Sequence, residues 1–186
     1  MAAYVEGRID LHVADILQLF DMMDPYPFRE RDISGEVDEH IYDEATDIPK
    51  NVPIAIFVHI PASAADTEAA RGLNTAFANF FQGQAGRASR ELSQLLRLGR
   101  QALVIGLVVL ALCVVIGQVL YSLLDGTTYI ASFILEGFMI LGWVANWRPM
   151  EIFLYDWWPI VQKRNLYRRL ASAPVTVVPY QVAPQG

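Results

Sequence analysis

The most constraining feature of this sequence is a run of 23 residues without a charged side chain, "ALVIGLVVLALCVVIGQVLYSLL", at residues 102–124. A helix made of this run, at ~1.5 Å per residue, exceeds the ~30 Å hydrocarbon thickness of a bilayer. A second apolar run, "YIASFILEGFMILGWVANW", follows after the four-residue link "DGTT" and contains one charge, Glu136. The short link predicts an antiparallel pair of transmembrane helices at residues 102–124 and 129–148. A buried hairpin in a soluble protein is the alternative.

The placement of basic residues predicts the orientation of this helix pair. Four arginines precede the first span, five Lys/Arg residues follow the second, and the link at 125–128 carries only Asp125. Because basic residues stay on the cytoplasmic side, we expect both termini in the cytoplasm and the link outside. The N-terminus also lacks the basic and apolar regions of a cleavable signal peptide, which agrees with a cytoplasmic start.

Aromatic and basic residues gather near the inner end of the second span and along residues 149–171. We predict an interfacial amphipathic helix there, kinked at Pro159. Aromatic rings favour the headgroup layer, and each basic side chain adds ~1 kcal/mol of attraction to anionic lipids. The expected interface anchors are Trp143, Trp147, Arg148, Tyr155, Trp157, Trp158, Lys163, Arg164, Arg168 and Arg169. No cofactor is predicted, although the aromatic cluster at 153–158 would also suit the tail of a bound lipid, quinone or pigment.

Charge is unevenly divided along the chain. Residues 1–50 hold 13 acidic against 4 basic side chains, a net of −9, and the remaining residues hold 7 against 10, a net of +3. Hydrophobic residues make up 54% of the whole chain. These values predict a small acidic soluble unit joined to a short membrane part. They argue against nucleic-acid binding, because an acidic soluble unit repels phosphate.

Local patterns predict an α+β membrane protein, in which the transmembrane helical hairpin carries a small cytoplasmic β-α-α-β unit. The unit at 1–62 comprises a strand at 4–13, a helix capped by Asp15, a helix at 34–48 and a strand at 52–61. Residues 63–101 are predicted to form cytoplasmic and interfacial helices, interrupted at 82–86 by glycines. A strand at 174–180, in the C-terminal segment 172–186, would complete the sheet.

Glu136 is the one charged residue within the apolar runs 102–124 and 129–147. Gln118 lies six residues before the end of the first span and Glu136 seven after the start of the second, so both lie about 9–10 Å deep. A protonated Glu136 can donate to the Gln118 amide, a bond worth ~0.6–2 kcal/mol. We therefore predict an interhelical polar pair. A proton or ligand site and a contact with another subunit are the alternatives.

No residue pattern points to catalysis or metal binding. His12, His40 and His59 lack ligand spacing, and the single cysteine, Cys113, lies within an apolar run. Phosphate-binding and nucleophile motifs are missing from the sequence. We therefore predict a non-enzymatic protein with no catalytic or metal-binding residue. In the proline-containing segment "DPYPFRERD", the residues predicted to contact a partner are Tyr26, Phe28, Arg29 and Arg31.

Two segments, "LFDMMDPYPFRERDI" at 19–33 and "GWVANWRPMEIFLYDWWPI" at 142–160, resemble an uncharacterised family of bacterial two-span inner-membrane proteins with an acidic cytoplasmic N-terminal unit. The resemblance implies a bacterial inner-membrane location and no known activity. We predict an accessory, assembly or stabilising subunit of a larger membrane complex. Its partners would be other membrane-protein subunits, in a hetero- or homo-oligomer, and anionic lipids. The alternative is a homo-oligomeric channel or transport element with Glu136 in the pore.

Overall fold

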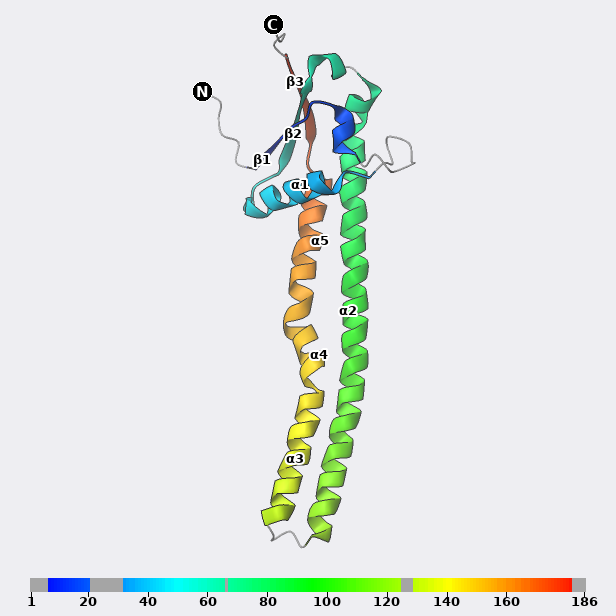
Figure 1. The fold of residues 1–186 in the computed structure, drawn as a ribbon, viewed down its shortest axis with the longest axis vertical. Coiled ribbons are helices and arrows are strands. Elements are labelled where there is room, and N and C mark those ends of the chain that lie inside the picture. Colours follow the sequence, from blue (N-terminus) through cyan, green and yellow to red (C-terminus); the bar gives the residue numbers. More distant parts are fainter. Residues whose placement is uncertain (1–6, 21–31, 66, 125–128, 182–186) are drawn as a thin grey trace. The chain divides into compact units, whose positions relative to one another are not determined.

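The computed structural model of the chain describes residues 7–20, 32–65, 67–124 and 129–181 (Figure 1). The chain divides into two compact units. We call Met1–Ala88 with Gln162–Gly186 the sheet unit and Ser89–Val161 the hairpin unit. The described residues are mostly helical, with one small parallel sheet and two long apolar helices, which is compatible with the predicted α+β class.

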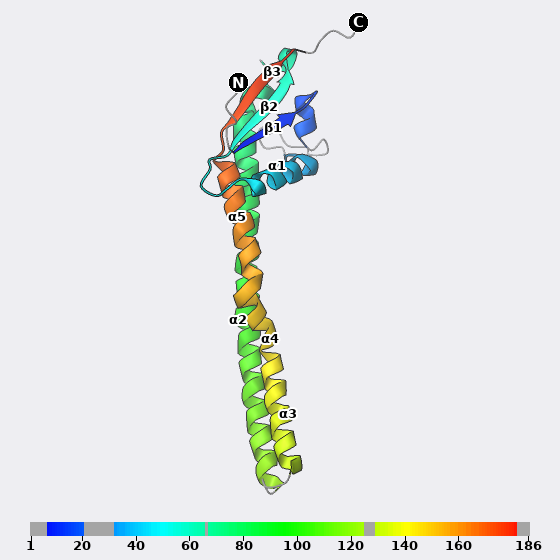
Figure 2. The ribbon, with the colours of Figure 1, turned by 90° about the vertical axis from the view of Figure 1, so that its left-hand side faces the viewer.

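The sheet consists of three parallel strands in the order β1-β2-β3 (Figure 2). Strand β1 is Arg8–His12, β2 is Ala55–Pro61 and β3 is Val175–Tyr180. The apolar strand β2 is central, and the C-terminal strand β3 pairs with it, with Ile56 opposite Val175. The prediction that the C-terminal strand completes the sheet is confirmed.

Of the two helices predicted in the N-terminal unit, the structure contains one and shortens the other. Helix α1, Gly35–Asp47, begins where expected, because the Ser34 Oγ accepts a hydrogen bond from the Val37 N–H at 3.4 Å. The helix predicted after Asp15 is wrong in its described part, which is a single 3-10 turn, η1, Ile16–Leu19. Asp15 caps this turn, but the chain is extended at Phe20, where a bridge to Ile33 draws it out of the helical path.

Helix α2, Glu68–Leu123, follows the short 3-10 turn η2, Ala62–Ala64, and continues without interruption for 56 residues. The predicted break at 82–86 is therefore wrong. A glycine in a helix costs only about 1 kcal/mol. Phe77, Phe81 and Ala85, four residues apart, are all buried on one face, so packing holds the helical register through the glycines.

The core of the sheet unit lies on one face of the sheet. Ile9, Ile56 and Val58 are fully buried there, in one cluster with Leu73 and Phe77 of α2. Ile41 of α1 and Leu170 of α5, Trp157–Ala171, belong to the same cluster. Within the sheet unit, no described helix or strand covers the opposite face (Figure 1).

In the hairpin unit, α3, Tyr129–Ala145, is followed by α4, Trp147–Glu151, a π-helical turn η3, Ile152–Asp156, and the start of α5. Helix α3 ends at Ala145, three residues before the predicted end of the second span at residue 148, and the helix is interrupted at Asn146. Pro159 lacks an N–H and cannot bond the Tyr155 carbonyl, and the wider π turn lies just before it. The predicted interfacial helix is thus divided into three parts.

Among the described residues, two helical stretches, Glu68–Leu123 and Tyr129–Ala171, are long and apolar enough to cross a membrane. Only 17% of the residues in the most apolar window of each stretch are buried. A core helix of a soluble protein would be mostly buried instead. The large apolar side chains on these surfaces include Val104, Ile105, Phe133 and Ile140.

Candidate functional site

The uncovered face of the parallel sheet gathers polar and aromatic side chains from all three strands. Because alternate residues of a strand point to opposite faces, burying Ile9 and Leu11 turns their neighbours outward. The strand register aligns Asp10 with Phe57 and Thr176, and His12 with His59 and Val178. We call this surface the open face; its residues are Arg8, Asp10, His12, Phe57, His59, Thr176, Val178 and Tyr180.

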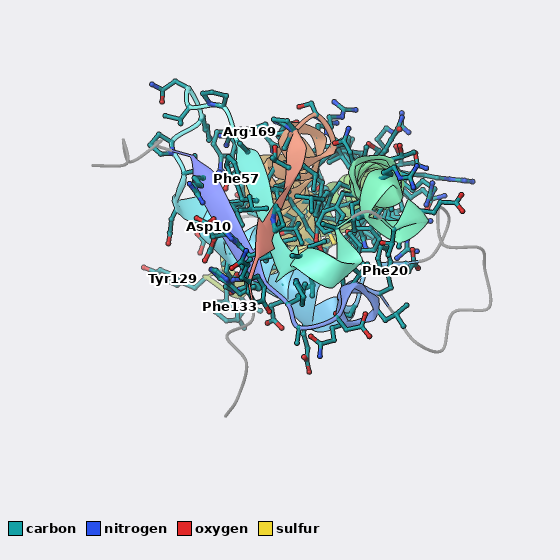
Figure 3. The ribbon with its side chains drawn as sticks, turned by 90° about the horizontal axis from the view of Figure 1, so that it is seen from above. Asp10, Phe20, Phe57, Tyr129, Phe133 and Arg169 are labelled. Carbon is teal, nitrogen blue, oxygen red and sulfur yellow. The ribbon has the colours of Figure 1, made fainter. Side chains whose placement is uncertain are left out.

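Asp10 is the centre of a hydrogen-bonded group on the open face. The Arg8 guanidinium donates from Nε and Nη2 to the two Asp10 carboxylate oxygens, both at 2.6 Å. The His59 Nε2 lies 2.7 Å from Asp10 Oδ1, which links strands β1 and β2. Figure 3 shows Asp10 and Phe57 on these neighbouring strands. The bidentate geometry restrains the Arg8 and Asp10 side chains.

Ring contacts extend this group across the sheet. The imidazoles of His12 and His59 are stacked, with centroids 4.2 Å apart, and the Arg8 guanidinium carbon lies 4.3 Å from the Phe57 ring centroid. The Tyr180 hydroxyl of β3 donates to the Val13 carbonyl at 3.4 Å. The open face is therefore an ordered aromatic and polar surface. Contacts with one another hold the side chains of Arg8, Asp10, His12, Phe57 and His59 in place.

The same contacts determine the electrostatics of Asp10. The hydrogen bonds from Arg8, and secondarily from His59, hold the pKa of Asp10 below its ordinary value, although partial burial opposes them. In turn, Asp10 raises the pKa of Arg8. The group therefore contains a firmly ionised pair. Among the described residues, no cluster of three or more His, Cys, Asp or Glu side chains has a geometry that could hold a metal ion.

A second polar pair of the sheet unit lies on its helical side. The Tyr167 hydroxyl of α5 donates to Asp38 Oδ2 of α1 at 3.3 Å, while the buried Asp38 Oδ1 has no hydrogen-bond partner among the described residues. Burial raises the pKa of Asp38, although the Tyr167 bond opposes this shift. Burial and the Asp38 carboxylate raise the pKa of Tyr167. The pair joins the two helices at an electrostatic cost.

In the hairpin unit, α2 and α3 approach each other through small residues. A Cβ added to Gly142 would lie 2.6 Å from Leu110 Cδ1, so this close approach requires glycine. Asn146, 8% exposed, donates from Nδ2 to the Gly106 carbonyl at 3.1 Å and to the Gly142 carbonyl at 3.0 Å. We call the line of contact between α2 and α3 the seam; its residues are Gly106, Leu110, Gly117, Leu135, Gly142 and Asn146. Its polar residue, Asn146, was missed by sequence reasoning, although its position after a glycine-containing apolar run is a usable signal.

The structure gives the predicted Gln118–Glu136 pair equal depth but no mutual bond. A Cβ at Gly117 would contact Leu135 and Phe138, which places the residues after Gly117 and Leu135 at the same level. Both polar side chains are nevertheless exposed, and within the described ranges no hydrogen bond joins them. The predicted hydrogen bond within one chain is therefore not formed. Gln118 and Glu136 each follow a seam residue by one position, and one position along a helix turns the side chain by about 100° away from the seam.

The predicted interface anchors fall into two groups. Trp143, Trp147, Tyr155 and Trp158 are more than half exposed, and Trp157 is half-buried, with its Nε1 donating to the Phe153 carbonyl. The Arg148 guanidinium pairs with Glu151 at 3.1 Å and with Asp156 at 3.3 Å. All of these residues belong to the hairpin unit. Their contact with lipid stays a prediction.

The other anchors, Lys163, Arg164, Arg168 and Arg169, belong to the sheet unit. Arg169 Nη2 donates to the carbonyls of Pro49 and Val52, at 3.0 and 2.9 Å, and so holds the connection between α1 and β2. This guanidinium has a structural role that its sequence position did not reveal. The predicted partner-binding residues Tyr26, Phe28, Arg29 and Arg31 lie outside the described residues.

Comparisons with protein-family models, curated proteins and solved structures give no match for this chain. The resemblance to bacterial two-span inner-membrane proteins therefore stays a prediction.

Proposed function

We propose that this chain is a non-enzymatic accessory or assembly subunit of a larger membrane complex, anchored by its helical hairpin in the bacterial inner membrane. Both termini would be cytoplasmic, and the open face would bind a partner subunit. The observation that carries the proposal is a three-stranded parallel sheet with one face left uncovered by the described elements. All-parallel sheets are found almost only with both faces covered.

The composition of the open face supports a protein partner. It presents Phe57 and Tyr180, whose rings provide large contact areas, beside the Arg8–Asp10 pair and the stacked imidazoles. Aromatic residues and arginine are enriched where proteins bind each other. The side chains are also ordered by their own contacts, which lowers the entropic cost of binding. Anionic lipids would supply a second, weaker contact through Lys163, Arg164 and Arg168.

The test uses the full-length tagged chain, crosslinked in native membranes, purified in mild detergent and mapped by mass spectrometry. We expect a stoichiometric membrane-protein partner with crosslinks on the strands of the open face. Phe57→Ala and Tyr180→Ala should each weaken its recovery by roughly tenfold, as expected for loss of an aromatic anchor. Glu39→Ala, on the exposed side of α1, is the matched control and should leave the recovery unchanged.

Two results would reject this function. One is a chain that purifies from native membranes without a stoichiometric partner. The other is a partner that both open-face variants retain while hydrogen exchange shows the sheet intact. Cell fractionation tests the anchor separately, because a chain recovered without membranes would contradict insertion.

A further inference from the structure

The outer part of the hairpin exposes two polar side chains at one level. Gly117 lies against Leu135 and Phe138, and Gly142 lies against Leu110 and Cys113, so both contacts define the same antiparallel register. In this register the residues following Gly117 and Leu135, which are Gln118 and Glu136, differ in height by no more than about one residue, or ~1.5 Å. Both are exposed. If the hairpin lies in a membrane, as proposed above, both face hydrocarbon.

The two side chains also lie on the same flank of the hairpin. Each follows a seam residue by one position, which rotates it by about 100° around its own helix. The helices run antiparallel, so these rotations have opposite senses when viewed from one end and carry both side chains to the same side. Ser132, one turn before Glu136 and also exposed, extends this surface. We call Gln118, Ser132 and Glu136 the polar flank.

We propose that a second copy of this chain covers the polar flank, with Gln118 of each copy bonded to Glu136 of the other. This inference rests on the membrane insertion proposed above. Two copies inserted in the same orientation are related by a two-fold axis along the membrane normal, and that axis preserves depth. If residue i of the first copy contacts residue j of the second, then residue j of the first copy must contact residue i of the second. Gln118 and Glu136, at equal depth on one flank, meet this condition.

The chemistry of the two groups is complementary. The amide N–H of Gln118 donates to a carboxyl oxygen of Glu136, and the symmetry makes this bond twice. Polar side chains in hydrocarbon are costly unless they are paired, and such pairs join helices. A different protein could supply its own donor to Glu136, and that contact would not need an amide of this chain at the same depth. The equal depth of a carboxyl and an amide therefore favours a second copy.

The test is disulfide formation between differently tagged full-length copies in native membranes, with Cys113→Ala in each. One copy carries Gln118→Cys and the other carries Glu136→Cys. We expect a disulfide that joins the two tags. The matched control pairs Ile116→Cys with Gly137→Cys, which lie at the same depth but on the other flank, and a Cβ at Gly137 meets open space. The control should give at most about a tenth of the product.

A second measurement keeps the dimer distinguishable from the membrane insertion on which it rests. A membrane-impermeant maleimide should label the Gln118→Cys copy only after detergent is added; labelling without detergent would overturn both the insertion and the dimer. An inserted chain whose polar-flank pair forms no more disulfide than the control overturns the dimer alone, as does a crosslink to a different protein. Gln118→Leu with Glu136→Leu should lower the dimer association constant roughly tenfold.

Discussion

Gly106→Ala gives the sharpest test of how the two long helices of the hairpin unit are held together. A Cβ at Gly106 would lie 2.7 Å from the Asn146 Oδ1 and 3.1 Å from the Ala145 carbonyl oxygen. The first distance is too short, so the Asn146 side chain has to move. Moving it breaks the hydrogen bonds that its Nδ2 donates to the Gly106 and Gly142 carbonyls.

The expected cost follows from these contacts. An interhelical hydrogen bond in a membrane protein is worth ~0.6–2 kcal/mol. Asn146 donates one such bond to the Gly106 carbonyl of α2, and it donates a second, local bond to the Gly142 carbonyl of α3. The gain from replacing glycine with alanine in a helix is ~1 kcal/mol and opposes this loss. With the displaced Ala145 carbonyl included, we expect Gly106→Ala to lower the free energy of unfolding by ~1–2 kcal/mol. Gly137→Ala, which meets open space, should raise it by ~0.5–1 kcal/mol.

The assay is reversible unfolding of the full-length protein in mixed micelles, followed by the fluorescence of the tryptophans, all of which lie in the hairpin unit. In an Asn146→Ala background the clash at Gly106 is largely removed, so the two changes should be non-additive by about 1 kcal/mol. Equal effects of Gly106→Ala and Gly137→Ala would refute the reasoning. So would strict additivity of Gly106→Ala and Asn146→Ala.

Two further predictions concern the acidic residues. Burial raises the pKa of Asp38 above its ordinary value of 3.8. The charged carboxylate therefore lowers the free energy of unfolding at pH values above the raised pKa, and this loss of stability is absent below pH 3.8. Asp38→Asn should therefore increase hydrogen-exchange protection of β2 at pH 7 by roughly 0.5–1 kcal/mol, a figure reduced for partial exposure. The gain should vanish near pH 3, whereas a gain independent of pH would contradict this cause. Glu136→Gln should leave ion flux into liposomes unchanged, while lost flux would favour the channel alternative over a subunit contact.

Much of the sheet unit was predictable because its signals are local. The amphipathic helix predicted at 34–48 is α1, and the apolar strand predicted at 52–61 contains β2. The helix predicted after Asp15 failed for a non-local reason, since Phe20 pairs with Ile33. The break predicted at 82–86 failed because burial of Phe81 outweighs the helix propensity of two glycines.

The open face depended on tertiary structure. His12 and His59 are far apart in sequence, and only the parallel pairing of β1 with β2 stacks their rings and brings His59 to Asp10. The Tyr180 contact with Val13 requires the C-terminal strand to join the same sheet. Periodicity shows which face a residue occupies, but strand order and register determine its neighbours.

The sequence by itself determined the apolar helix pair, its short link and the equal depth of Gln118 and Glu136, because these follow from length and helical rise. Only the tertiary structure decided which residues form the seam. Close approach at Gly117 and Gly142 places those glycines between the helices and turns Gln118 and Glu136 outward. The physical reason is that helical rise sets height along an axis, whereas packing sets the rotation around it.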